Sequence, residues 1–125
     1  MTNILALPLV ALAIKTGNNE DWIDTVKYVV GDPTGPQLDL RGIAFLMEIR
    51  RQASDHEVLL TGSTSDLTIS IGAFPNYGFL IIHFNDETMA TMQAGSYVAD
   101  VVAQADGFER RTLDITLTIV EGVTR

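Results

Sequence analysis

The 125-residue chain has no cysteine, and its eight basic residues are outnumbered by sixteen acidic ones, giving a formal net charge of −8. Without cysteine, disulfides, thiolate metal sites and a cysteine nucleophile are all excluded. A nucleic-acid partner is not expected, because phosphate contact requires clustered Lys and Arg. A hydrophobic content of 46% is that of a globular domain and not of a disordered chain.

The chain also has no apolar run long enough to span a membrane. Its longest apolar stretch, Ile4–Ile14, contains Pro8 and is roughly half the length that a membrane-spanning helix needs. Ala11-Leu12-Ala13 has the form of a signal-peptide cleavage site, but Met1-Thr2-Asn3 carries no positive side chain. We therefore expect neither membrane insertion nor secretion by a signal peptide.

Most of the chain consists of short segments in which apolar and polar residues alternate with a period of two. This period is typical of β-strands with one buried face. About seven or eight such strands, at a spacing of roughly 8–12 residues, predict an all-β, antiparallel sandwich of Greek-key type or a barrel. These segments include Trp22–Val30, Ile43–Ile49, Leu67–Ile71, Tyr97–Ala103 and Leu113–Ile119. Phe79–Phe84 is instead continuously apolar apart from His83, as a central strand of a sandwich can be.

One segment is typical of a short helix. Asn85 is placed to cap a helix over Asp86–Met92, with two acids in its first turn and Gly95 as its stop. Further on, Asp106-Gly107 predicts a tight hairpin before the last strand.

The amino end is divided by Pro8 into an apolar arm, residues 1–8, and a sandwich domain, residues 9–125. An exposed apolar arm is typical of an interface, so Leu5, Leu7 and Leu9 are candidate assembly contacts. The alternative is that the arm folds back along its own sheet.

We find no recognisable catalytic or metal-binding motif, and we expect no cofactor, no metal and no enzymatic activity. His56 and His83 are isolated, and His83 is interpreted as a hydrogen-bonded or outward-facing side chain. Calcium favours oxygen donors, but the clustered acids Glu20, Asp21 and Asp24 lack EF-hand spacing and are interpreted as a solvated turn.

The remaining candidates for chemistry are equally weak. Ser63 lies in Gly62-Ser63-Thr64-Ser65, which lacks the frame of a nucleophile elbow and is interpreted as a hydrophilic loop. Strand alternation places Asp100 and Asp114 on one face, but nothing marks them as a glycosidase pair. Three aromatic side chains remain as a possible sugar-stacking set, namely Trp22, Tyr28 and Tyr77.

Several short motifs occur in a recognisable order along the chain. They are Leu38-Asp39-Leu40-Arg41-Gly42, a strand ending in Glu48-Ile49-Arg50, Ala94-Gly95-Ser96-Tyr97 followed by Asp100-Val101, Asp106-Gly107, and Glu121-Gly122-Val123-Thr124-Arg125. In this order the sequence resembles small immunoglobulin-like β-sandwich domains of tailed-phage and prophage virion proteins, notably the N-terminal domain of baseplate upper proteins. The resemblance extends from about residue 14 to residue 125, and its motifs are structural.

The resemblance implies a non-enzymatic structural component of a virion, made in the cytoplasm of a bacterial host. Such a protein acts by contacts with other virion proteins in the baseplate or tail, or as an attachment point for receptor-binding parts, and forms a homo-oligomer. Two alternatives stay open: a decoration protein of the head or neck, and a carbohydrate-binding β-sandwich module.

Overall fold

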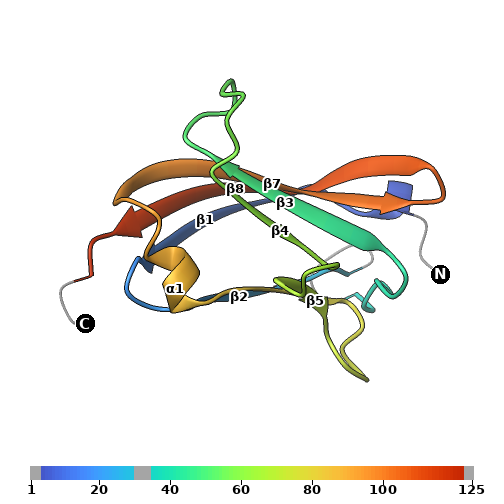
Figure 1. Cartoon of the computed structure of the whole chain (residues 1–125). Helices are drawn as coiled ribbons and strands as arrows, with labels where there is room; N and C mark the ends of the chain where they lie inside the picture. The colour runs from blue at the N-terminus through green and yellow to red at the C-terminus, as the bar shows by residue number, and fades with distance from the viewer. Residues whose placement is uncertain (1–3, 30–34, 123–125) are drawn as a thin grey trace.

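Strands account for most of the computed structural model, which describes residues 4–29 and 35–122 (Figure 1). The described residues form eight strands, one short α-helix and one 3-10 turn, η1. In chain order these are η1 Ile4–Ala6, β1 Val10–Gly17, β2 Trp22–Lys27, β3 Ala44–Arg50, β4 Leu60–Ser63, β5 Ile69–Ile71, β6 Phe79–Phe84, α1 Asp86–Met89, β7 Gly95–Ala105 and β8 Phe108–Val120.

The strands form two sheets, with the orders β1-β8-β7-β3-β4 and β2-β6-β5. Strands β8-β7-β3-β4 correspond to G-F-C-C′ of an immunoglobulin domain, and β2-β6-β5 to B-E-D. The predicted all-β, immunoglobulin-like sandwich is thus confirmed. One detail differs from a fully antiparallel sandwich, because β1 runs parallel to β8.

The core lies between the inner faces of the two sheets. β8 lies between β1 and β7, and it contributes four buried aliphatic residues at alternate positions: Leu113, Ile115, Leu117 and Ile119. From the smaller sheet, Trp22 stacks on Phe84 with ring centroids 5.4 Å apart. The alternation seen in Leu113–Ile119 thus corresponds to one buried face of β8.

The connections around β7 agree with the sequence in kind but not always in length. Asp106 and Gly107 have positive φ angles of 54° and 78°, as a two-residue hairpin turn requires. Asn85 caps α1 by accepting a hydrogen bond from the N–H of Thr88, as expected. The helix ends at Met89 and not at Met92, and Gly95 begins β7 and does not terminate the helix.

Two predictions near β4 and β5 were wrong. Gly62 and Ser63 belong to β4, where they pair with Met47 and Leu46, and are not part of a hydrophilic loop. Leu67 does not extend the face of Ile69, because its φ of 68° turns the chain and its side chain is 77% exposed. Apolar and polar residues do alternate in this segment, but the strand begins at Ile69, after the turn.

The amino end packs on its own domain. Ile4 and Leu7 are buried in the core, and the Nε of Arg110 donates a 2.6 Å hydrogen bond to the Leu7 carbonyl oxygen. The first strand begins at Val10, after this arm. Residues 1–3 of the arm lie outside the described residues.

Hydrogen bonds show which connections lie together at one end of the sandwich. The N–H of Leu40, just before β3, bonds to the carbonyl oxygen of Tyr77, just before β6. Near the same end, β3 begins at Ala44, which pairs with Gln104 beside the β7–β8 turn. We call this the loop end, comprising residues 35–43, residues 72–78 and the Asp106-Gly107 turn. Helix α1 lies at the opposite end (Figure 1).

Candidate functional site

The most exposed large hydrophobic side chain among the described residues is Phe74, at 79%. It lies in the connection between β5 and β6, residues 72–78, which protrudes from the loop end (Figure 1). Burial of an aromatic ring is strongly favourable, so an exposed ring carries binding potential. The surroundings of Phe74 determine whether that ring is held in one position.

Phe74 is supported by a second aromatic ring. The Tyr77 ring lies edge-on to Phe74, with centroids 6.0 Å apart and an interplanar angle of 63°. The guanidinium carbon of Arg41 lies 3.9 Å from the centroid of Tyr77, a cation–π distance. Phe74, Tyr77 and Arg41 thus form a continuous row of contacts.

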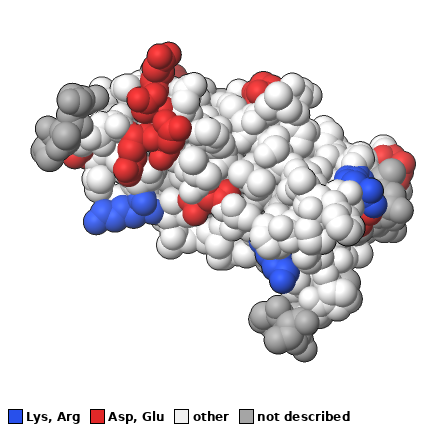
Figure 2. Space-filling model, turned by 90° about the horizontal axis from the view of Figure 1, so that it is seen from below, with Lys and Arg blue, Asp and Glu red and all other residues white. Residues whose placement is uncertain are grey.

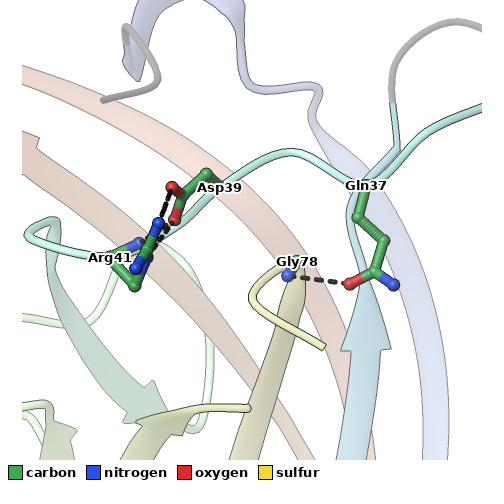
Figure 3. Close-up of polar contacts among 4 residues, drawn as sticks. All are labelled: Gln37, Asp39, Arg41 and Gly78. Atoms are coloured by element: carbon green, nitrogen blue, oxygen red, sulfur yellow. Dashed lines mark hydrogen bonds and ion pairs between the residues drawn. The ribbon is translucent and has the colours of Figure 1, made fainter. Parts of the chain in front are cut away.

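Arg41 is itself held by Asp39, as Figure 3 shows. The Arg41 Nη2 lies 2.7 Å from Asp39 Oδ2, and Arg41 Nε donates to Asp39 Oδ1 at 3.0 Å. The backbone N–H of Arg41 donates to the same carboxylate at 3.0 Å. These hydrogen bonds from Arg41 lower the pKa of Asp39 to about 2. A two-pronged pair of this kind fixes the guanidinium plane against Tyr77.

The backbone of residues 72–78 is tied to the segment before β3 as well. Gly78 N–H donates to the Gln37 side-chain oxygen at 3.0 Å (Figure 3), and the Gly78 carbonyl accepts from Tyr28 N–H at 2.8 Å. The approach is so close that a Cβ on Gly78 would lie 2.7 Å from the Cβ of Gln37 and 2.8 Å from the Leu38 carbonyl oxygen. Only glycine fits here. The chain therefore presents Phe74 on a braced loop.

Pro75-Asn76-Tyr77-Gly78 is a turn-forming sequence, but nothing in it indicates the brace. Phe74 was part of no candidate set, and Asp39 and Arg41 were noted only as part of a resemblance motif. Their i, i+2 spacing was the one available signal, since an Asp two residues before an Arg can accept both its backbone and its side-chain N–H.

The structure separates the three predicted assembly contacts. Leu5 and Leu9 are 49% and 48% exposed, so their side chains are available to a partner. Leu7 is fully buried in the chain's own core and cannot offer its side chain. The 3-10 turn of η1 directs Leu7 inward, and the assembly role of these leucines stays a prediction.

His83 faces outward and is hydrogen-bonded, as interpreted from the sequence. Its Nε2 lies 2.9 Å from Asp21 Oδ2, and the other oxygen of Asp21 accepts from the N–H of Asp86 at 2.8 Å. The hydrogen bond to His83 is the main cause of a lowered pKa at Asp21. Figure 2 shows acidic side chains gathered toward the end of the smaller sheet where α1 lies.

The other acids of this cluster are used within the fold. Glu20 Oε1 accepts from the N–H of Gly17 at 3.0 Å, and Asp24 Oδ2 accepts from Trp22 Nε1 at 2.6 Å. Among the residues that the structure describes, no group of three His, Asp or Glu is placed to hold a metal ion.

Asp100 and Asp114 do share the outer face of the larger sheet. They are cross-strand neighbours, and Glu48 is the neighbour of Asp100 on its other side. Arg50 and Arg111 line the same shallow hollow. Burial is the main cause of a raised pKa at Asp100.

Ser63, the other residue considered for chemistry, has a structural contact. Its hydroxyl accepts from the N–H of Asp66 at 3.2 Å and so supports a turn.

The aromatic residues considered for sugar stacking are not available as a set. Trp22 and Tyr28 are buried in the core, and Tyr77 is covered on one face by Arg41. Burial raises the pKa of Tyr28 to about 12. A sugar-stacking platform cannot be built from these three rings.

No protein-family model matches the chain, and no curated protein matches its sequence. Within residues 4–29 and 35–122, no helix is both long and apolar enough to cross a membrane. The braced loop around Phe74 is therefore the site on which a functional proposal rests.

Proposed function

We propose that the chain is a non-enzymatic structural domain of a tailed-phage virion that acts by binding another virion protein through its loop end. The contact is made in the baseplate or tail, or at the point where receptor-binding parts attach. The order of motifs from Leu38 to Glu121 supports the virion setting. The exposed, braced Phe74 is the observation that carries the contact-making role.

Binding energy at protein interfaces is concentrated in a few aromatic or Arg anchors that enter a pocket on the partner. Ordering a loop on binding costs free energy, and a loop that is already held avoids that cost. Asp39 holds Arg41 against the Tyr77 ring, and Gly78 bonds to Gln37, so residues 72–78 are held in place before a partner arrives. This is the arrangement expected of a docking loop.

The partner is expected to be a protein. The net charge of −8 opposes binding to phosphates of nucleic acids and to anionic membrane surfaces. The burial of Trp22 and Tyr28 leaves no aromatic platform of the proposed kind for a carbohydrate.

The proposal is tested in particles purified from the producing bacterial strain. Mass spectrometry of the particles should detect the chain, and immunogold labelling should place it at a fixed position. A Phe74→Ala variant with an unchanged melting temperature should be incorporated much less than the natural chain. Leu67→Ala is the matched control, because Leu67 is similarly exposed but lies outside the loop end. Absence of the chain from particles contradicts the virion setting, and normal incorporation of Phe74→Ala contradicts the docking loop.

A further inference from the structure

β1 is the longest of the four strands that border a sheet. It has eight residues, against six in β2, four in β4 and three in β5. Proteins protect open edges with short strands, charges, prolines or bulges. β1 carries a single charged residue, Lys15, and no proline. Its edge is therefore ready to pair with another strand.

The direction of the backbone groups on β1 follows from two hydrogen bonds. Asn18 N–H bonds to the Val120 carbonyl oxygen on β8, whereas Gly17 N–H points away from β8 and is bonded to Glu20 Oε1. In a parallel ladder, alternate residues direct both backbone groups to the same neighbour. Ala11, Ala13 and Lys15 thus present theirs outward, where none of the described residues pairs with them.

Side chains on both faces of β1 also lack complete cover. Val10, Leu12 and Ile14 face the core but are only partly buried. On the outer face, Ala11 and Ala13 line a shallow hollow of mainly alkyl groups. An added strand would cover the aliphatic residues on one face and meet Ala11, Ala13 and Lys15 on the other.

We infer that β1 pairs with β1 of a second copy of this chain, antiparallel, about a twofold axis at Ala13. The two five-stranded sheets then form one continuous sheet. This inference deepens the proposed function by naming one partner. It rests on the proposed function only in assuming that the domain acts by binding other proteins.

The register follows from the bonds already made. Centring the pair on Ala13 uses residues 10–16 of both strands, all inside β1, and leaves the bond from Gly17 to Glu20 intact. A centre at Leu12 would need Leu9, which precedes the strand. A centre at Ile14 would need the N–H of Gly17. In the chosen register Leu12 faces Ile14 of the second copy, so aliphatic residues meet across the axis.

Charge supports a second copy as the occupant. In this register Lys15 of the second copy lies opposite Ala11, and Ala11 is the cross-strand neighbour of Asp114 on the same outer face. Two strand spacings, about 9.6 Å, separate that Lys15 from Asp114. Because Ala11 is small, the long Lys side chain can reach over it to the carboxylate. The symmetry produces this ion pair twice, and β1 contains no acid of its own.

Analytical ultracentrifugation of the purified chain over a concentration series tests the inference. The natural chain should reach twice 13.6 kDa. Ala13→Lys places like charges opposite each other at the axis and should raise the dimer dissociation constant at least about tenfold. Ala44→Lys is the control, because Ala44 is also exposed but lies on an interior strand. A chain that stays monomeric, or a dimer unaffected by Ala13→Lys, overturns the inference.

Two further variants test the register. Lys15→Asp and Asp114→Lys should each weaken the dimer, and the double variant should restore it; failure of the restoration overturns this register. Since the chain has no cysteine, Ala13→Cys should form a disulfide-linked dimer under mild oxidation, whereas Ala44→Cys should not. This readout decides the matter if Ala13→Lys fails to fold. A monomer in these experiments leaves the Phe74 docking loop untouched, and loss of particle incorporation by Phe74→Ala leaves the β1 pairing untouched.

Discussion

The hydroxyl of Tyr97 donates a hydrogen bond to the carbonyl oxygen of Gln93, 2.5 Å away. This contact joins the segment after α1 to the start of β7 and matches the tyrosine corner of immunoglobulin domains. Those domains carry a cysteine two residues later, where this chain has the buried Ala99. The corner is thus kept without the disulfide. Arg51 stacks on the Tyr97 ring at 4.4 Å and covers it from outside.

Removing the Tyr97 hydroxyl should weaken the fold. In Tyr97→Phe the Gln93 carbonyl loses its partner, and the free energy of unfolding should fall by about 0.5–1.5 kcal/mol in urea titrations. Gln93→Ala keeps the backbone carbonyl and should stay within about 0.5 kcal/mol of the natural chain. Equal effects of the two changes would contradict a role for the hydroxyl.

Ile115 is expected to be among the costliest positions to truncate. It is buried on the inner face of β8, so Ile115→Ala should lower the free energy of unfolding by about 2–5 kcal/mol. Thr116→Ala, on the exposed face of the same strand, should change it by less than about 0.5 kcal/mol. Urea melts of both variants make the comparison, and a small loss at Ile115 would mean that the sheet face is open.

Some features of the strands and of the helix cap could be predicted from the local sequence pattern alone. The alternation in β8 matched burial because one face of an interior strand meets only core. The Asn85 cap was equally local, since a capping side chain bonds to an N–H three residues on. Leu67 followed the same alternation but was misplaced, because a positive φ overrides the period of two without leaving a signal in apolar spacing.

The candidate binding surfaces could not be predicted from the local sequence pattern. The brace on Phe74 depends on Arg41, which lies in a separate segment brought alongside by the loop end. Leu5, Leu7 and Leu9 are spaced two residues apart, so an extended chain would place all three side chains on one face. The η1 turn interrupts the extended conformation, and of these three leucines only Leu7 is buried. The open edge of β1 was not predictable either, because strand order is a property of the whole sheet.

The Asp39 carboxyl should titrate far below its usual range. The hydrogen bonds from Arg41 lower its pKa to about 2 in the folded chain, against an ordinary 3.8. The resulting contribution to stability is complete above pH 3.8 and is lost as the pH falls toward 2. A pH titration followed by carboxyl-carbon NMR should show this midpoint. Arg41→Ala should return it toward 3.8, whereas Arg51→Ala should leave it unchanged.

Asp100 should behave in the opposite sense. Burial raises its pKa in the folded chain, so its contribution to stability is largest below the ordinary 3.8 and is lost as the pH rises through the raised value. At pH 7 the charged side chain lies between its cross-strand neighbours Glu48 and Asp114. Asp100→Asn should therefore raise the free energy of unfolding at pH 7 by about 0.2–1 kcal/mol, the range of cross-strand pairs. The gain should vanish below pH 3.8. A loss at pH 7 would show that Arg111 outweighs the two acids.

The amino-terminal arm supplies the last prediction, because its two kinds of leucine have separate roles. Leu7 is fully buried, and its carbonyl oxygen accepts from Arg110. Leu7→Ala should therefore lower the free energy of unfolding by about 2–5 kcal/mol, as for other buried leucines. Leu5→Ala should leave it within about 0.5 kcal/mol, since half of that side chain is already in water.

Urea melts of the two variants distinguish an arm that packs in the chain's own core from an arm that packs only against a partner protein. If Leu7→Ala unfolds at the same urea concentration as the natural chain, the arm is detached in solution, and all three leucines become available for assembly. If Leu7→Ala is strongly destabilised, as we expect, only Leu5 and Leu9 remain as contacts. Their joint replacement by Ser should then reduce incorporation into particles with little loss of melting temperature, because about half of each side chain is already exposed.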